Sequence, residues 1–169
     1  CIQFNGYHDS SNWRDPAADA KAYGRAFATA FGPTHGSGVV DTVQIGNEPG
    51  SKMSDSLFHT VFENMAEGIR EIDPDLKIVT PYVKVGGGNN YAKDIALFSD
   101  ITHLVDAYAA HPYPFVETWP TYERSFPENP AQPMLSDMNA IIAWRNANDP
   151  TAESWVTEFG YDATTAPND

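Results

Sequence analysis

Short apolar runs alternate along this sequence with longer stretches that have the period of an α-helix, and few folds satisfy such an order. The apolar runs lie at residues 39–45, 76–80, 105–110 and 154–158, and residues 1–5 resemble the end of a further strand. The helical stretches lie at residues 16–31, 57–72, 95–101 and 135–147. Parallel strands need long crossover connections, which are usually helices, so this order predicts parallel βαβ units. We therefore predict an α/β fold with about five β-strands.

Helix boundaries in the sequence agree with this interpretation. Asp15 and Pro16 form a typical N-cap and first-turn pair, and prolines follow the helical stretches closely at Pro74 and Pro150. The stretches 86–90 and 112–133 are rich in Gly, Pro and aromatic residues and are too long for simple connections. We interpret both as functional loops.

Length and charge exclude several classes of partner. The chain has 169 residues, enough for one domain with a substantial core, so we assign residues 1–169 to a single domain. Its 23 acidic residues outnumber 10 basic ones, which gives a net charge of −13. Phosphate backbones repel such a chain, so we expect no nucleic-acid partner. No apolar run approaches the roughly 18 residues of a membrane span, so we expect no membrane partner.

Cysteine content and surface charge bear on the cellular location. Cys1 is the only cysteine, so the chain alone can form neither a disulfide nor a thiolate metal cluster. The first residues do not form the basic and apolar segments of a signal peptide, and we interpret the start of the sequence as a point where a longer chain was cut. An acidic surface with few lysines is common in secreted or salt-exposed proteins, which favours an extracellular or periplasmic location.

Polar side chains stand at the carboxyl ends of three predicted strands. Asn47 and Glu48 follow the first run, His111 and Tyr113 follow the third, and Glu158 ends the fourth. Parallel strands bring their carboxyl ends to one rim, where α/β sheets and barrels collect catalytic groups. We therefore expect Glu48 and Glu158 to converge although they are distant in sequence. Glycoside hydrolysis needs at least two carboxyl groups that converge on the bond to be cleaved.

Three motifs around these residues resemble motifs of the clan A glycoside hydrolases. IGNEP at residues 45–49 is similar to the strand-four signature of that clan, HPY at 111–113 to its strand-six His-x-Tyr pattern, and WVTEFGY at 155–161 to its strand seven. The resemblance implies a (β/α)8 TIM barrel with Glu48 as acid/base and Glu158 as nucleophile.

The resemblance also implies roles for the neighbouring residues and a retaining mechanism. Asn47 would bind the sugar 2-hydroxyl, and Tyr113 would hydrogen-bond the nucleophile; we also expect His111 to hydrogen-bond Glu158. Glu48 would protonate the leaving oxygen while ionised Glu158 attacks, and Glu48 would then activate the water that releases the covalent glycosyl-enzyme. An inverting or transglycosylating relative that uses the same two glutamates stays open.

The resemblance covers about strands three to seven, so we expect a partial (β/α)8 barrel. A whole barrel takes about 250 residues. The first two strands, with the arginine that the clan carries near the nucleophile, and strand eight, with its platform tryptophan, are lacking. We therefore expect the remaining barrel segments to belong to a longer parent chain. The NEP and TEFGYD sequences look most like those of glycoside hydrolase family thirty-nine and of the marine agarase and porphyranase families. This resemblance does not define which sugar is cleaved.

Aromatic residues in the predicted rim loops are candidate platforms for sugar rings. Trp119 is the best single candidate, and Trp13 and Tyr82 are further candidates for substrate binding. A loop anchored by a buried aromatic ring is the alternative interpretation of each. We assign Trp144 and Trp155 to core packing. The expected substrate is a neutral or mixed β-linked glycan, because the acidic surface argues mildly against highly sulfated or uronate-rich polymers.

We expect no cofactor and no metal ion at the site. His8, Asp9, His35 and His103 lack metal-ligand spacing, although a structural ion in a loop stays open. The glycines at 86–88 lack the Lys-Ser/Thr of a phosphate loop, so we interpret them as a turn near the sugar cleft.

Two other functions stay open, a carbohydrate-binding barrel without turnover and a flavodoxin-like nucleotide-binding domain. The acidic charge and the lack of a phosphate loop argue against the second.

Overall fold

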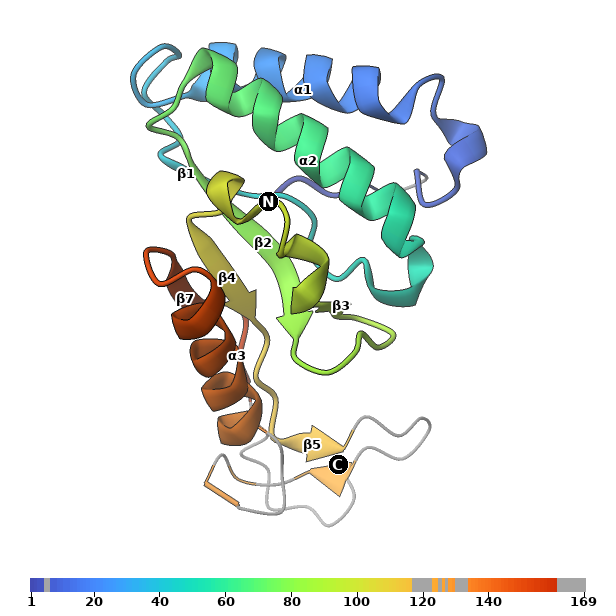
Figure 1. The fold of residues 1–169 in the computed structure, drawn as a ribbon, viewed down its shortest axis with the longest axis vertical. Helices are drawn as coiled ribbons and strands as arrows, with labels where there is room; N and C mark the ends of the chain where they lie inside the picture. Colours follow the sequence, from blue (N-terminus) through green and yellow to red (C-terminus); the bar gives the residue numbers. More distant parts are fainter. Residues whose placement is uncertain (5–6, 117–122, 125, 127, 130–133, 161–169) are drawn as a thin grey trace.

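The computed structural model describes residues 1–4, 7–116, 123–124, 126, 128–129 and 134–160 (Figure 1). In chain order its elements are η1 (Ser10–Asn12), α1 (Pro16–Phe31), β1 (Thr42–Gln44), η2 (Gly50–Lys52), α2 (Asp55–Ile72), β2 (Lys77–Lys84), β3 (Lys93–Asp94), η3 (Ile95–Phe98), η4 (Thr102–Leu104), β4 (Ala107–Ala110), β5 (Phe115–Val116), β6 (Glu123–Arg124), α3 (Met134–Asn148) and β7 (Glu153–Val156).

The main sheet is parallel throughout, as the alternation of strands and helices predicts. Its strand order is β1-β2-β4-β7, and the short β3 pairs with the end of β2. A parallel bridge between Ile2 and Ile45 adds the start of the chain beside β1. All carboxyl ends therefore lie at one edge of the sheet, which is the arrangement of successive strands in a (β/α)8 barrel. The predicted α/β class is confirmed.

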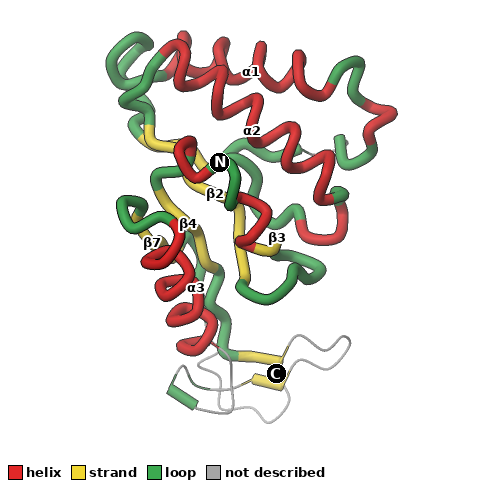
Figure 2. The backbone as a smooth tube through the Cα atoms, in the orientation of Figure 1, coloured by secondary structure: helices red, strands yellow, loops and turns green. Residues whose placement is uncertain are grey.

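Helices α1 and α2 run side by side along the same side of the sheet (Figures 1 and 2). Two glycines permit this close crossing. A Cβ atom on Gly24 would lie 2.1 Å from the carbonyl oxygen of Met65, and one on Gly68 would lie 2.3 Å from that of Lys21. Any larger residue at either position would push the helices apart, because the obstructing atoms belong to the backbone.

The main core lies between α2 and the sheet, with aromatic rings at its centre. The rings of Phe62 and Phe98 meet edge to face with centroids 4.9 Å apart. Helix α3 packs on β2, β4 and β7, where Trp144 meets buried Tyr108 edge to face at 5.3 Å. Trp155 packs against a smaller buried cluster that contains Val79. Both tryptophans thus pack against the core, as predicted.

Three segments differ from the sequence prediction. The first strand is only Thr42–Gln44, because Val39 is 74% exposed and precedes the paired region. Residues 95–101 form no α-helix; two 3₁₀ turns, η3 and η4, carry the chain over the short distance to β4. The stretch predicted as a loop contains an antiparallel pair, β5 with β6. Within the described ranges, no helix has both the length and the apolar character that crossing a membrane requires.

Candidate active site

A tight loop after β1 carries Asn47 and Glu48 to the carboxyl edge of the sheet. Gly46 opens this loop at a φ of +82°, a conformation that favours glycine, and a Cβ atom there would lie 3.1 Å from the ring of Phe58. The backbone N–H of Tyr82 donates to the Asn47 carbonyl at 2.9 Å, which ties the loop to β2. The side chain of Glu48 is therefore presented from a fixed backbone.

His111, just beyond β4, connects the two glutamates. Its Nδ1 atom lies 2.9 Å from Glu48 Oε1 and 3.7 Å from Glu158 Oε2. Its imidazole is buried and stacks on the ring of Tyr82, with centroids 4.8 Å apart and an interplanar angle of 13°. Glu48 and Glu158 are 27% and 39% exposed, so two accessible carboxyl groups stand over a buried ring.

Tyr113 supports Glu158 from the loop that follows β4. Its hydroxyl donates to Glu158 Oε2 at 3.2 Å. Burial raises the pKa of the Tyr113 hydroxyl, and its hydrogen bond to Glu158 and the charges of Glu158 and Glu48 raise it further. Tyr113 therefore remains a neutral donor throughout the physiological pH range. Its ring also lies against Gly160, where a Cβ atom would come within 3.3 Å of Tyr113 Cε1.

The structure brings the expected central residues together. One oxygen from Glu48, one from Glu158 and a ring nitrogen of His111 all lie within 4.8 Å of one another. The expected contact between Tyr113 and Glu158 is present, whereas His111 hydrogen-bonds Glu48 in place of Glu158. This difference arises because the Nδ1 edge of the ring faces the loop after β1.

The structure corrects the placement of Tyr82. This residue lies in β2 and not in a rim loop, and it is only 7% exposed. Its ring supports His111 from one face, so it is no exposed platform for a sugar.

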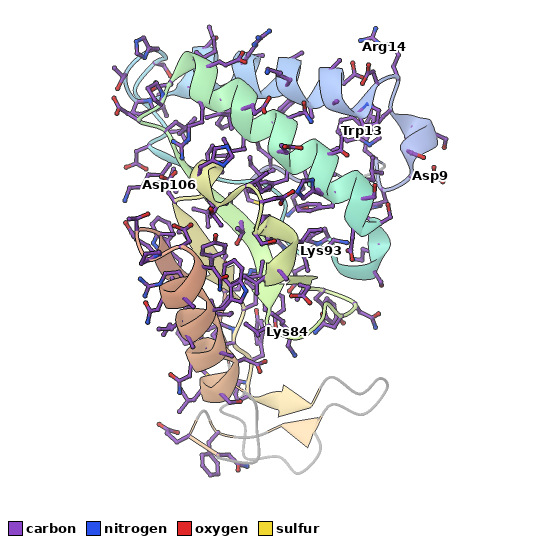
Figure 3. All side chains as sticks on the ribbon, in the orientation of Figure 1. Asp9, Trp13, Arg14, Lys84, Lys93 and Asp106 are labelled. Carbon is purple, nitrogen blue, oxygen red and sulfur yellow. The ribbon has the colours of Figure 1, made fainter. Side chains whose placement is uncertain are left out.

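The two tryptophan candidates are placed differently. Trp13 lies just before α1 (Figure 3), where its Nε1–H donates to the Tyr7 carbonyl at 2.8 Å. It lines a pocket of about 350 Å³ together with Phe4, Tyr7 and Tyr23, and neither Glu48 nor Glu158 lines that pocket. Trp119 lies outside the described residues.

The same three side chains are the one group of His, Cys, Asp and Glu among the described residues close enough to share a metal ion. Two carboxylates and one imidazole are a suitable donor set for a divalent cation. The 2.9 Å contact between His111 Nδ1 and Glu48 Oε1 is a hydrogen bond, so these two atoms share a proton.

Sequence reasoning missed one residue near this site, Lys93. It is 2% exposed, and its ammonium donates to the Gly50 carbonyl at 2.6 Å, to the Met53 carbonyl and to Asp55 Oδ1 at 2.8 Å. Figure 3 shows it on β3, beside the loop that leads into α2. A single lysine gives no sequence signal of burial, because two of its three partners are backbone carbonyls.

Comparison with known proteins identifies the fold. No family model and no curated protein sequence matches the chain. Among solved structures, the chain is similar to CelM2, a bifunctional glucanase-xylanase protein from a metagenome library, with a TM-score of 0.59 and 12% identity over 87% of this chain. It is also similar to the exo-β-1,4-mannosidase Op5Man5 from Opitutaceae bacterium strain TAV5, with a TM-score of 0.52 and 20% identity over 90% of this chain.

The chain has the fold of a partial (β/α)8 barrel. It spans 40% of the length of CelM2 and 28% of that of Op5Man5. In the partial barrel, Glu48, His111 and Glu158 all lie at the carboxyl ends of strands, the edge at which such barrels carry their active sites.

Proposed function

We propose that the partial barrel carries the catalytic centre of a retaining glycoside hydrolase that cleaves β-linked glycans. The observation that carries this proposal is the proximity of Glu48 and Glu158. One carboxylate oxygen of Glu48 lies within 4.8 Å of one carboxylate oxygen of Glu158. Retaining enzymes hold their two carboxyl groups about 5–5.5 Å apart, whereas inverting enzymes leave about 6.5–9.5 Å for a water molecule. Two carboxyl groups with oxygens this close favour the retaining arrangement, and so direct attack by a carboxylate.

In the first step, Glu158 attacks the anomeric carbon and Glu48 donates its proton to the departing glycosidic oxygen. The anomeric carbon exchanges its bond to the leaving oxygen for a bond to Glu158, so the glycosyl group becomes covalently attached. In the second step, Glu48 takes a proton from water, and the resulting hydroxide displaces Glu158. Two inversions at one carbon retain the anomeric configuration.

The neighbouring residues support these two roles. Tyr113 donates a hydrogen bond to Glu158 Oε2, which stabilises the ionised form that attacks. His111 holds Glu48 Oε1, so the other oxygen of Glu48 is available for the catalytic proton. Asn47, adjacent to Glu48 in the loop after β1, lines the same pocket and would hydrogen-bond the sugar as the transition state develops.

We propose further that additional βα units of a longer chain complete the barrel. The described sheet runs from the bridge at Ile2 to β7 along an open path. A closed barrel of this type has eight strands, so its remaining strands must lie between these two edges.

The test uses the full-length protein and aryl β-glycosides of glucose, xylose and mannose. Glu158→Gln should lower kcat by about 10³- to 10⁴-fold, because it removes the nucleophile but keeps its size. Glu153→Gln is the matched control, since Glu153 lies in the same β7 and pairs with Lys77 at the surface. It should keep its activity. Proton NMR of the first product should show the anomeric configuration of the substrate.

Two results would contradict the proposal. Release of the inverted anomer would show that water attacks directly, and equal activity of Glu158→Gln and wild type would remove Glu158 from the reaction. Binding of oligosaccharides without turnover by the wild type would favour a carbohydrate-binding barrel.

A further inference from the structure

A second pocket lies immediately beside Glu48, between the start of the chain and the loop after β1. Its volume is about 130 Å³. Among the described residues, five with polar side chains line it: Gln3, His8, Asn47, Glu48 and Lys52. A pocket that shares the proposed acid/base with the reaction centre is positioned to hold the sugar unit next to the bond that is cleaved.

Lys52 differs from every other cation whose side chain the structure describes. The remaining described lysine and arginine side chains each have a carboxylate or carbonyl partner, as in the pairs Lys21 with Glu67 and Arg70 with Asp106. Lys52 has no such partner among the described residues. In a chain with a net charge of −13, carboxylates are abundant, so a lysine without one beside the reaction centre is notable.

The described lining of the pocket contains a cation, Lys52, although the whole chain carries a net charge of −13. Among the described residues that line it, Glu48 has the only carboxyl group, and His111 hydrogen-bonds Glu48. Asp9, the neighbour of His8 in sequence, accepts a hydrogen bond from the backbone N–H of Ser11 and caps η1. The lining therefore combines one free ammonium with the amides of Gln3 and Asn47 and the imidazole of His8, all suited to an anionic group.

We propose that this pocket binds a sugar unit that carries an anionic substituent, a carboxylate or a sulfate ester, with Lys52 as its charge partner. This inference rests on the proposed glycoside hydrolase function, because the ligand is the unit adjacent to the cleaved bond. It names a substrate class that the net charge of the chain does not by itself indicate.

The experiment measures binding and not turnover, by calorimetry on the full-length protein that carries Glu158→Gln. The probes are a β-1,4-linked glucose tetrasaccharide, its C6-oxidised glucuronate form and its C6-sulfated form. The acidic probes should bind about tenfold more tightly than the neutral one, which is the size of one charge-assisted contact. A preference for only one of the two acidic probes identifies the substituent. About 1 M salt should weaken the preference, because screening then acts within about 3 Å.

Variants at Lys52 separate this contact from general electrostatics. Lys52→Met should remove the preference, and Lys52→Arg should restore most of it. Lys77→Met is the matched control, because it makes the same charge change at the amino end of β2 and removes only the surface pair with Glu153. It should keep the preference.

The outcomes distinguish the two proposals. Equal affinity for the three probes, failure of both acidic probes to bind, or an unchanged preference in Lys52→Met would overturn the inference. Turnover of neutral glycosides in that case would leave the proposed function standing. A clear acidic preference that depends on Lys52, without turnover by the wild type, would overturn the proposed function and support the binding site.

Discussion

The imidazole of His111 hydrogen-bonds Glu48, with 2.9 Å between Nδ1 and Oε1, while its Nε2 atom is buried without a partner among the described residues. A buried N–H without an acceptor is rarer than a buried acceptor without a donor, so this environment favours the tautomer with its proton on Nδ1. His111 is therefore a donor to Glu48, and it fixes the orientation of the carboxyl group that would deliver the proton.

His111→Ala should lower kcat by about 10- to 100-fold with little change in KM, because Glu48 loses the donor that orients it. His111→Asn should recover part of kcat, since its amide can donate toward Glu48. The measurement is steady-state kinetics on the full-length protein, with circular dichroism to verify folding. Equal kcat values for His111→Ala and wild type would show that His111 serves only the packing against Tyr82.

Tyr113→Phe should reveal the raised pKa of the Tyr113 hydroxyl. A raised folded-state pKa contributes stability that is fully present below the ordinary value of about 10 and is lost as the pH rises above it. The free energy of unfolding of wild type should therefore fall more steeply above about pH 10 than that of Tyr113→Phe. Parallel denaturant titrations at several pH values measure this difference.

Wild type and Tyr113→Phe must be compared directly because burial also raises the pKa of Tyr108, which both proteins retain. The same variant should lower kcat by about tenfold, since Glu158 loses one hydrogen bond to its ionised form. Identical pH dependence of the two proteins would contradict the assigned direction of the shift.

Periodicity and strand-end chemistry predicted most of the fold and the centre of the site. The parallel strands and the convergence of Glu48 with Glu158 follow from patterns that are local in sequence, because parallel strands bring their carboxyl ends together. The partner of His111 and the burial of Tyr82 did not follow. Both depend on how β2 and the loop after β1 lie beside each other, which no single segment encodes.

Lys93→Met should destabilise the protein by about 1–3 kcal/mol, because it leaves the Gly50 and Met53 carbonyls without their donor. Methionine keeps the length of the side chain and its packing beside Phe58. The free energy of unfolding in denaturant measures the loss. Lys21→Met is the control, since its ion pairs with Glu67 and Glu71 are partly exposed, and it should cost at most about 1 kcal/mol. Equal losses in the two variants would mean that the buried contacts of Lys93 add nothing.

Gly50→Ala should disturb the loop after β1 more than the same substitution disturbs a loop whose glycine has no close neighbours. Gly50 has a φ of +33°, and a Cβ atom there would lie 2.1 Å from the carbonyl oxygen of Asn90, so the loop after β1 and the loop after β2 would have to separate. Gly86→Ala is the matched control, because Gly86 has a φ of +86° but nothing within 4 Å of its Cβ position.

Backbone strain alone should cost Gly86→Ala about 1–2 kcal/mol of unfolding free energy, with kcat unchanged. Gly50→Ala should lose more stability and also lose kcat, because Gly50 lies two residues after Glu48 and shares its loop. Denaturant unfolding and kinetics on both variants test this difference. If kcat falls equally in both, the contact between the two loops does not position Glu48, and strain in either loop is sufficient to disturb the site.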